Sequence, residues 1–276
     1  MIPDSDRPLL VGILNVTPDS FSNDGEHFQT DLAIEHALLM VEQGADIIDI
    51  GGESTRPGAG RVSPEEQLER VIPVIEGLRK HANQIVPISI DSTSSRVVNA
   101  AFDAGASIIN DVSAGMDDEQ VLHFAASVNA PLILMHMQGQ PKNMQDSPHY
   151  ENVVEEVCSF LVSRAKAAES AGVKADNIFL DPGIGFGKTK QNNLDLIANL
   201  QRLSETGYGV FLGASRKRFM GSICDIEKYS ELVGATCATT ALAVMAGVRM
   251  IRVHDIKENR QALDVAFALK QSMPFQ

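Results

Sequence analysis

The sequence predicts an α/β protein with a (β/α)8 TIM barrel fold, on three observations. Short runs rich in valine, isoleucine and leucine recur along the chain, amphipathic stretches lie between them, and nearly every run ends in a polar residue. Runs that are apolar without alternation are typical of parallel strands covered on both faces. Eight strand–helix units fit the 276 residues. A doubly wound open sheet is the alternative that this pattern leaves open.

The strands are predicted from the apolar runs and the helices from the stretches between them. The strands are expected at residues 9–16, 45–50, 86–91, 107–112, 131–137, 178–181, 210–214 and 250–254. Helices are expected at residues 30–43, from Ser63 onward, and at 92–104, 151–171, 230–246 and 258–271. Thr30 and Ser63 are candidate N-caps, and Gly44 is a candidate C-cap. No linker divides the chain, so we expect one domain over residues 1–276.

The composition is that of a globular protein with an acidic balance. Hydrophobic residues make up 44% and charged residues 21%, and the formal net charge is −13. This charge argues against nucleic acid or an anionic membrane as a partner, although a local site can still be positive. No apolar run is long enough to span a membrane, no signal peptide is recognisable, and the three cysteines are too scattered for a CxxC motif. We therefore expect a cytoplasmic protein.

Polar residues stand where a barrel of this kind places its chemistry. Active sites of these barrels form at the carboxyl ends of the strands. The polar residues at the predicted strand ends are Asn15, Asp49, Glu53, Asp91, Asn110, Asp111, His136, Asp181, Ser215, Lys217, Arg252, His254 and Asp255. A single one could cap the next helix, which is the favoured interpretation for Asp111 and Asp255 and stays open for Asp49. Their convergence from all eight strands predicts a polar ligand site.

Strand alternation indicates a cationic corner in this site. Residues two apart on a strand point the same way, so Arg252 and His254 share a face, as do Ser215 and Lys217. Asn15 lies on the first strand, which closes the ring beside the eighth. A cluster of arginine, histidine and asparagine suits phosphate or pyrophosphate.

An acidic arc is predicted on the opposite side of the barrel mouth. Asp91, Asn110 and Asp181 end strands three, four and six. Carboxylate and amide oxygens can accept hydrogen bonds from the N–H groups of an amino-heterocycle. The inferred ligand thus combines a hydrogen-bond-donating ring with a phosphate-bearing end.

The glycine-rich run at residues 181–189 ends in Gly-Lys-Thr, as a phosphate-binding P-loop does. That motif needs a glycine at position 182, which is proline, and the dinucleotide fingerprint needs one at position 188, which is lysine. We therefore interpret the run as a tight turn whose glycines let a flat ligand approach closely.

Eight segments in this order resemble the dihydropteroate synthases. They are Gly-Ile-Leu-Asn-Val-Thr-Pro-Asp-Ser-Phe-Ser at 12–22, Asp-Ile-Gly-Gly-Glu-Ser-Thr-Arg-Pro-Gly at 49–58, Ile-Asp-Ser at 90–92, Ile-Asn-Asp at 109–111, Met-His-Met at 135–137, Leu-Asp-Pro-Gly-Ile-Gly-Phe-Gly at 180–187, Gly-Ala-Ser-Arg-Lys at 213–217 and Arg-Val-His-Asp at 252–255. They span almost the whole chain. The family's pattern is altered at 23–26, where Asn-Asp-Gly-Glu replaces an expected Asp-Gly-Gly.

The resemblance implies a (β/α)8 transferase of folate biosynthesis. It would condense 6-hydroxymethyl-7,8-dihydropterin pyrophosphate with p-aminobenzoate, by a dissociative displacement with Mg2+ present, to give 7,8-dihydropteroate and pyrophosphate. It also implies inhibition by sulfonamides and a homodimer. Our candidate dimer surface is formed by the late helices at 230–246 and 258–271.

The resemblance also implies a role for each matching residue. The catalytic residues would be Asp91, Asp181, Lys217 and Arg252. The pterin would contact Asp91, Asn110, Val112, Met135, Asp181, Phe186, Gly213, Lys217 and Arg252. Pyrophosphate would be held by Asn15, Arg252 and His254, with Asn15 also a metal ligand. The p-aminobenzoate site would comprise Phe21, Thr55, Arg56, Pro57, Ser215 and Lys217. Arg216 should point away from the barrel mouth and have a structural role.

Two other functions compete with this one. A methyltetrahydrofolate–corrinoid methyltransferase-like barrel would share the acidic arc, but it should lack the Glu-Ser-Thr-Arg-Pro loop and the Ser-Arg-Lys strand end, and both are present. A non-catalytic pterin-binding protein is the other alternative. The presence of Asn15, Lys217, Arg252 and His254 argues against it.

Overall fold

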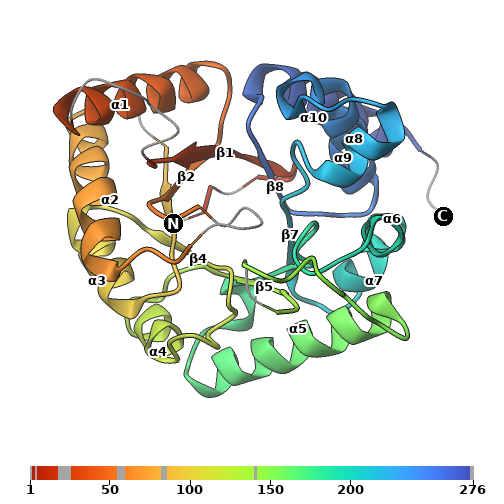
Figure 1. The fold of residues 1–276 in the computed structure, drawn as a ribbon, viewed down its shortest axis with the longest axis horizontal. Coiled ribbons are helices and arrows are strands. Elements are labelled where there is room, and N and C mark those ends of the chain that lie inside the picture. The colour runs from red at the N-terminus through yellow and green to blue at the C-terminus, as the bar shows by residue number, and fades with distance from the viewer. Residues whose placement is uncertain are drawn as a thin grey trace.

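A computed structural model shows eight parallel strands in one closed barrel with helices around it (Figure 1). It describes residues 2–3, 5–17, 26–54, 60–81, 86–139 and 142–273. The strands are β1 (Leu9–Asn15), β2 (Ile47–Gly51), β3 (Ile88–Asp91), β4 (Ile108–Asp111), β5 (Leu132–Met135), β6 (Ile178–Asp181), β7 (Gly209–Leu212) and β8 (Met250–Val253). Because β8 pairs in parallel with β1, the ring closes. The predicted TIM barrel is confirmed, and the open sheet is wrong.

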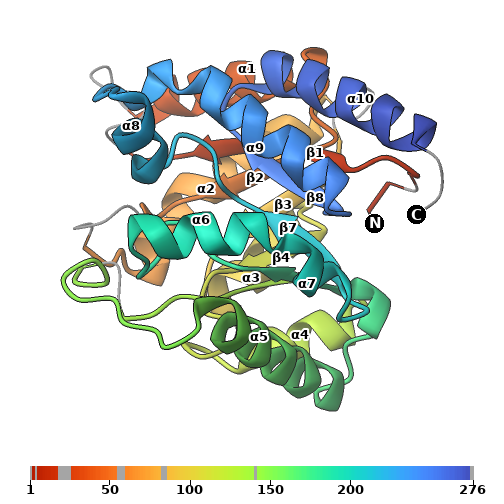
Figure 2. The same ribbon diagram turned by 90° about the vertical axis from the view of Figure 1, so that its right-hand side faces the viewer.

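The helices follow the strands around the barrel in chain order (Figures 1 and 2). They are α1 (Glu26–Glu42), α2 (Pro64–Arg79), α3 (Ser95–Ala104), α4 (Gln120–Ser127), α5 (Val153–Ser170), α6 (Lys190–Ala198), α7 (Leu200–Ser204), α8 (Arg218–Cys224), α9 (Val233–Met245) and α10 (Ile256–Ser272). Within the described ranges, no helix combines the length and apolarity that crossing a membrane requires.

The helix boundaries show which local signals were sufficient. Ser63 caps α2 as predicted, because its Oγ accepts a hydrogen bond from the Glu66 N–H at 3.2 Å. The N-cap prediction for Thr30 is wrong, since α1 begins at Glu26 and Thr30 lies inside the helix. The pattern also missed α4, α6, α7 and α8, which have five to nine residues each. Helices this short complete too few turns for a periodic apolar face to stand out.

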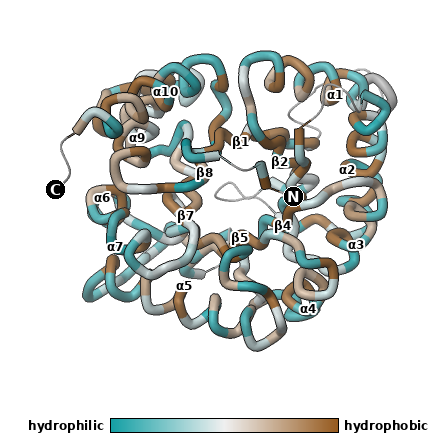
Figure 3. Tube along the Cα trace, turned by 180° about the vertical axis from the view of Figure 1, so that it is seen from behind, coloured by the Kyte–Doolittle hydropathy of each residue, from teal (hydrophilic) through white to brown (hydrophobic). Residues whose placement is uncertain are grey.

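The barrel interior changes from apolar to polar along the strands. A cluster of buried side chains from seven of the eight strands fills the apolar part of the interior: Leu9, Val11, Ile47, Ile108, Ile133, Phe179, Phe211 and Met250. Burying each such side chain contributes about 1.5–3 kcal/mol. A larger apolar cluster lies between strands and helices, and the strands are largely brown in Figure 3.

The next inward-facing layer lies two residues further along each strand, because side chains alternate across a sheet. Its members include Asp49 after Ile47, Asn110 after Ile108, Met135 after Ile133, Asp181 after Phe179, Gly213 after Phe211 and Arg252 after Met250. Strand register sets Asp91 beside Asn110, and Met135 beside Asp181. The apolar layer thus supports a polar layer at the carboxyl ends of the strands.

Candidate active site

Arg252 bridges two carboxylates at the polar end of the barrel. Its Nε donates to Asp49 Oδ2 at 2.6 Å, and its Nη2 donates to Asp91 Oδ2 at 3.0 Å. These two aspartate side chains are only 1% and 9% exposed. Burial raises the pKa of Asp91, and the Asp49 charge raises it further, whereas Arg252 opposes the shift. Burial works against the Arg252 charge, but the two carboxylates prevail and raise its pKa, so it stays a guanidinium.

Asp49 is a site residue that the sequence interpretation left open as a helix cap. Its Oδ2 accepts from both Arg252 and the Asn110 amide, the latter at 3.1 Å, so one oxygen orients two predicted pterin contacts. Its Oδ1 is buried and has no hydrogen-bond partner among the described residues. Such an oxygen is costly in a folded core and is more typical of a site than of a cap. Alternation from the buried Ile47 was the signal that could have placed Asp49 inside.

Asp181 lies buried on the other side of the barrel mouth, where the backbone of the following turn contacts its carboxylate. Its Oδ1 accepts from the Gly183 N–H at 2.7 Å. Burial raises the pKa of Asp181 to about 6, against the lowering effects of the Gly183 N–H, Lys217, Lys188 and Arg252. A Cβ on Gly213 would come within 3.7 Å of Asp181 Oδ2, an ordinary contact distance, so the residue after β7 lies directly beside this carboxylate. Asp181 is therefore ionised at neutral pH.

Lys217 stands opposite Asp181, over an apolar wall. Its Nζ lies 4.1 Å from the centre of the Phe186 ring, a cation–π contact. Met135, Met144 and Phe186 form one buried cluster, against which Val112 packs. The structure thus gathers the three predicted wall side chains, Val112, Met135 and Phe186, and adds Met144. Burial and the Arg252 charge lower the pKa of Lys217 to about 8, while Asp181 and Asp91 oppose this shift.

Ser215 is linked to His254 across neighbouring strands. Its Oγ lies 2.9 Å from His254 Nδ1 and accepts from the His254 backbone N–H at 3.2 Å. The predicted p-aminobenzoate contact and the predicted pyrophosphate contact are therefore adjacent. Asn15 ends β1, which pairs with β8.

Arg216 has the structural role expected of it. It adopts a left-handed backbone with φ of 56°. Its guanidinium binds Asp255, with Nε to Oδ2 at 3.0 Å and Nη2 to Oδ1 at 2.5 Å. The cap interpretation of Asp111 is wrong, because α4 begins only at Gln120 and Asp111 instead closes a turn, where it accepts from the N–H groups of Ser113 and Gly115. The cap interpretation of Asp255 is wrong, since its side chain makes no capping hydrogen bond to α10 and pairs with Arg216 instead.

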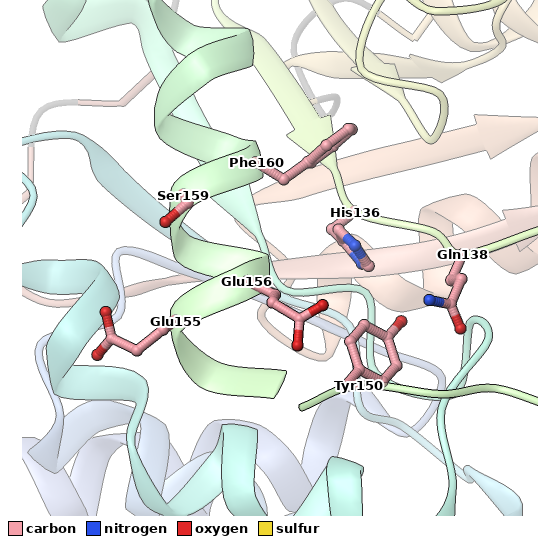
Figure 4. A pocket seen from close by; sticks show the side chains of 7 residues that line it. All are labelled: His136, Gln138, Tyr150, Glu155, Glu156, Ser159 and Phe160. Carbon is pink, nitrogen blue, oxygen red and sulfur yellow. The ribbon is translucent and has the colours of Figure 1, made fainter. Parts of the chain in front are cut away.

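Four predicted p-aminobenzoate contacts, Phe21, Thr55, Arg56 and Pro57, lie outside the described residues. The altered segment at 23–26 lies outside them except for Glu26, which begins α1. A cavity of about 490 Å3 opens beside α5, lined by His136, Gln138, Tyr150, Glu155, Glu156, Ser159 and Phe160 (Figure 4). His136 is the only predicted strand-end residue that lines this cavity. The cavity is thus separate from the polar cluster around Arg252.

Fold and site together define a class of protein: a (β/α)8 barrel with buried carboxylates, an amide and cationic side chains in contact at its mouth. The profile of the pterin binding enzyme family matches residues 11–254. A dihydropteroate synthase of Synechocystis sp. is 44% identical over 263 residues, which cover 95% of this chain and 90% of that protein.

Solved structures give the same result. The Xanthomonas albilineans dihydropteroate synthase with 4-aminobenzoic acid is similar with a TM-score of 0.90 and 46% identity, over 98% of this chain and 95% of that one. The Yersinia pestis dihydropteroate synthase with a sulfonamide drug has a TM-score of 0.90 and 40% identity, over 98% and 97%. The chain belongs to the dihydropteroate synthase family of pterin binding enzymes.

Proposed function

We propose that this protein condenses 6-hydroxymethyl-7,8-dihydropterin pyrophosphate with p-aminobenzoate, the dihydropteroate synthase reaction. One observation carries the proposal: a buried cluster in which Arg252 joins Asp49 and Asp91, with Asn110 bound to the same Asp49 oxygen. The names of the relatives support it, as does the structure of one of them with 4-aminobenzoic acid.

The pterin would lie between the acidic arc and the apolar wall. Asp91, Asn110 and Asp181 would accept hydrogen bonds from its ring N–H groups and amino group. The flat ring would contact the wall of Val112, Met135 and Phe186, with Gly213 leaving room at β7. The same site discriminates against rings without these donors, because they would leave buried carboxylates unpaired.

The pyrophosphate would lie toward β8 and β1. Arg252 still has Nη1 without a hydrogen bond among the described residues, so this nitrogen can bind a phosphate oxygen while the other two hold carboxylates. His254 and Asn15 would complete this subsite, with Lys217 beside it.

Mg2+ fits this subsite as an ion shared with the substrate. Mg2+ prefers oxygen ligands and is commonly held by one or two protein groups together with substrate phosphates. Asn15 offers an amide oxygen at the right strand end, and the described residues contain no cluster of three His, Cys, Asp or Glu suited to a metal. When bound, the ion would neutralise charge on the leaving group.

The reaction would then proceed through a cationic methylene group. The bond between the methylene carbon and the pyrophosphate oxygen breaks with both electrons leaving on oxygen, and Arg252 and Lys217 stabilise the departing charge. Asp91 and Asp181 stabilise the positive charge conjugated with the pterin. The amine of p-aminobenzoate attacks the methylene carbon and loses a proton. No covalent enzyme intermediate forms, so the free thiols of Cys158, Cys224 and Cys237 stay uninvolved.

Product analysis with the two substrates tests this function. Stoichiometric 7,8-dihydropteroate and pyrophosphate are expected from the purified protein with Mg2+. Tight binding of the pterin pyrophosphate without any product would instead favour the non-catalytic pterin-binding protein. Transfer of a methyl group from methyltetrahydrofolate to a corrinoid would favour the methyltransferase alternative.

Sulfonamides should inhibit competitively with p-aminobenzoate, because they mimic its arylamine and anionic end. The Yersinia pestis relative with a sulfonamide drug supports this expectation. We expect an inhibition constant comparable to the KM for p-aminobenzoate, measured at fixed pterin pyrophosphate. Inhibition competitive with the pterin, or an inhibition constant far above that KM, would contradict the assignment of Ser215 and Lys217 to this subsite.

We propose further that the enzyme is a cytoplasmic homodimer and that residues 1–276 form one domain. Free thiols fit a reducing compartment, and strands from both ends of the chain close one barrel. For the dimer, α9 and α10 pack together and expose Leu242, Val265 and Leu269, the last two 62% and 57% exposed. An apolar surface on neighbouring helices is typical of a protein interface.

Replacing both Val265 and Leu269 with glutamate should therefore convert the dimer to a monomer, because two buried charges would be left unpaired in the interface. Light scattering coupled to size exclusion measures the mass. The matched control is Leu39→Glu, an exposed leucine on α1 that should leave the mass unchanged. A dimer that survives the double substitution would place the interface elsewhere.

A further inference from the structure

The segment that follows β6 is held in place by side chains outside it and by Lys188 at its end. Three consecutive carbonyls each accept a hydrogen bond: Gly185 from Gln145 Nε2 at 2.6 Å, Phe186 from Lys188 Nζ at 3.0 Å, and Gly187 from Tyr150 Oη at 2.8 Å. A turn whose successive carbonyls are all bound to side chains has little freedom to shift.

Close packing against the end of β5 fixes the same segment from another direction. A Cβ on Gly183 would come within 1.9 Å of the His136 carbonyl oxygen, and one on Gly187 within 2.2 Å of the Gln138 carbonyl oxygen. Both glycines also have left-handed backbones, with φ of 67° and 60°. The segment is therefore built to lie directly on residues 136–138.

Lys188 is a buried cation between these two segments. It is 3% exposed, and its Nζ contacts His136 Nδ1 at 3.0 Å, the His136 carbonyl at 3.3 Å and the Phe186 carbonyl at 3.0 Å. Among the described residues, no carboxylate forms an ion pair with it. Burying an ammonium group without a paired carboxylate costs folding free energy, which its three hydrogen-bond contacts offset only in part.

The contact also determines the state of His136. When Lys188 carries its proton, its ammonium group only donates, so His136 Nδ1 accepts and the ring proton lies on Nε2. Burial and the Lys188 charge lower the pKa of His136 to about 3, which keeps the ring neutral. Burial lowers the pKa of Lys188 to about 7, an effect that Asp181 opposes. His136 and Tyr150 face the cavity beside α5, so the outer side of this anchor borders solvent (Figure 4).

What Lys188 holds is the backbone of Phe186, whose ring supports Lys217 at 4.1 Å and packs with Met135. A shift of this backbone would displace one wall of the ring-binding pocket and the cation above it. Neither displacement would touch Ser215.

We propose that Lys188 is a positioning residue for the pterin subsite, acting with His136 and Tyr150 to hold Phe186 in register with Lys217. The inference rests on the proposed function, since it takes the pterin to lie against Phe186. Lys188 itself does not contact substrate. Its effect should be larger on the pterin half of the site, which Phe186 lines, than on the p-aminobenzoate half, which it reaches only through Lys217.

Steady-state kinetics of Lys188→Met test the proposal, with each substrate varied in turn. The KM for the pterin pyrophosphate should rise about tenfold or more, the effect of losing a hydrogen bond from a charged group, while the KM for p-aminobenzoate, which depends on Phe186 only through Lys217, should rise by a clearly smaller factor. Tyr150→Phe removes the neighbouring anchor at Gly187 and should raise the same KM by a smaller factor. The matched controls are Lys190→Met and Tyr208→Phe, which lose only the exposed hydrogen bonds to Ser222 and Glu169.

Nitrogen NMR of the His136 ring gives a readout independent of activity. The wild-type protein should show a neutral ring protonated at Nε2, and Lys188→Met should lose this preference. An unchanged pterin KM in both variants, or equal changes in both KM values, would overturn the inference. If Lys188→Met does not fold, Tyr150→Phe still decides. A wild-type protein that forms no product would overturn the proposed function instead, while the NMR result would stand.

Discussion

Replacement of Lys217 with alanine should lower kcat/KM about a thousandfold, on the order of 4 kcal/mol, without unfolding the protein. The ammonium group stands 4.1 Å from the centre of the Phe186 ring, and in the proposed reaction it would stabilise the charge that develops as pyrophosphate leaves. Burial lowers its pKa to about 8, so the charge costs the folded state free energy, and its removal offsets part of the packing that alanine loses. Thermal unfolding should therefore change little, and Lys217→Met, which keeps the packing on Phe186, should change it least.

The pH dependence of kcat/KM should identify the ammonium group of Lys217 as the form required for activity. With the pKa of Lys217 near 8, the cation is present below that pH and is lost as pH rises through it. With the pKa of Asp181 near 6, its carboxylate is present above that pH and is lost as pH falls. The wild-type kcat/KM should be bell-shaped, with an acid limb set by Asp181 together with Asp91, whose pKa burial and the Asp49 charge also raise, and an alkaline limb set by Lys217. Lys217→Ala should lack the alkaline limb, and the exposed Lys228→Ala should keep it. Near-normal activity in Lys217→Ala would refute its role.

Replacement of Arg252 with methionine should have the second large effect, on both activity and stability. It leaves the Asp49 and Asp91 carboxylates buried without their shared cation. Breaking a buried ion pair from one side costs about 3–5 kcal/mol of unfolding free energy. The lost contact to the leaving pyrophosphate should lower turnover by about a further thousandfold. Chemical denaturation and steady-state kinetics measure the two effects separately.

A double substitution separates these two roles of Arg252. Asp49→Asn combined with Arg252→Met removes one of the unpaired charges, so it should recover part of the stability and none of the activity. The control is Arg260→Met, which breaks a largely buried pair with Asp46 at the amino end of β2, 2.9 Å from Nη1 to Oδ2. That variant should lose stability and keep its kcat. If the double variant is no more stable than Arg252→Met, then the unpaired carboxylates are not the cause of the stability that Arg252→Met loses.

Local pattern was sufficient for the strands and for much of the site. Apolar runs such as 178–181 mark buried strands because a covered sheet leaves no polar face, and their carboxyl ends carry Asp91, Asn110 and Asp181. The period of two along β8 then orients Arg252 inward. Arg216 lies beyond the end of β7 in a left-handed turn, so that turn, and not strand alternation, directs its side chain to Asp255. The strands and the orientation of Arg252 depend on neighbours in the chain, so no tertiary information was needed to predict them.

Only the closed barrel decided which charges meet. Asp49 binds Arg252 across 203 positions of sequence, because β1 pairs with both β2 and β8 and brings the first and last strands together. Lys188 likewise contacts His136 across 52 positions, where two loops pack through their backbones. Hydrogen bonds and ion pairs depend on distances in space, and strand periodicity carries no record of them. The sequence alone therefore determined a polar barrel mouth, and the tertiary structure decided that Asp49 binds Arg252 there and that Lys188 binds His136 beside it.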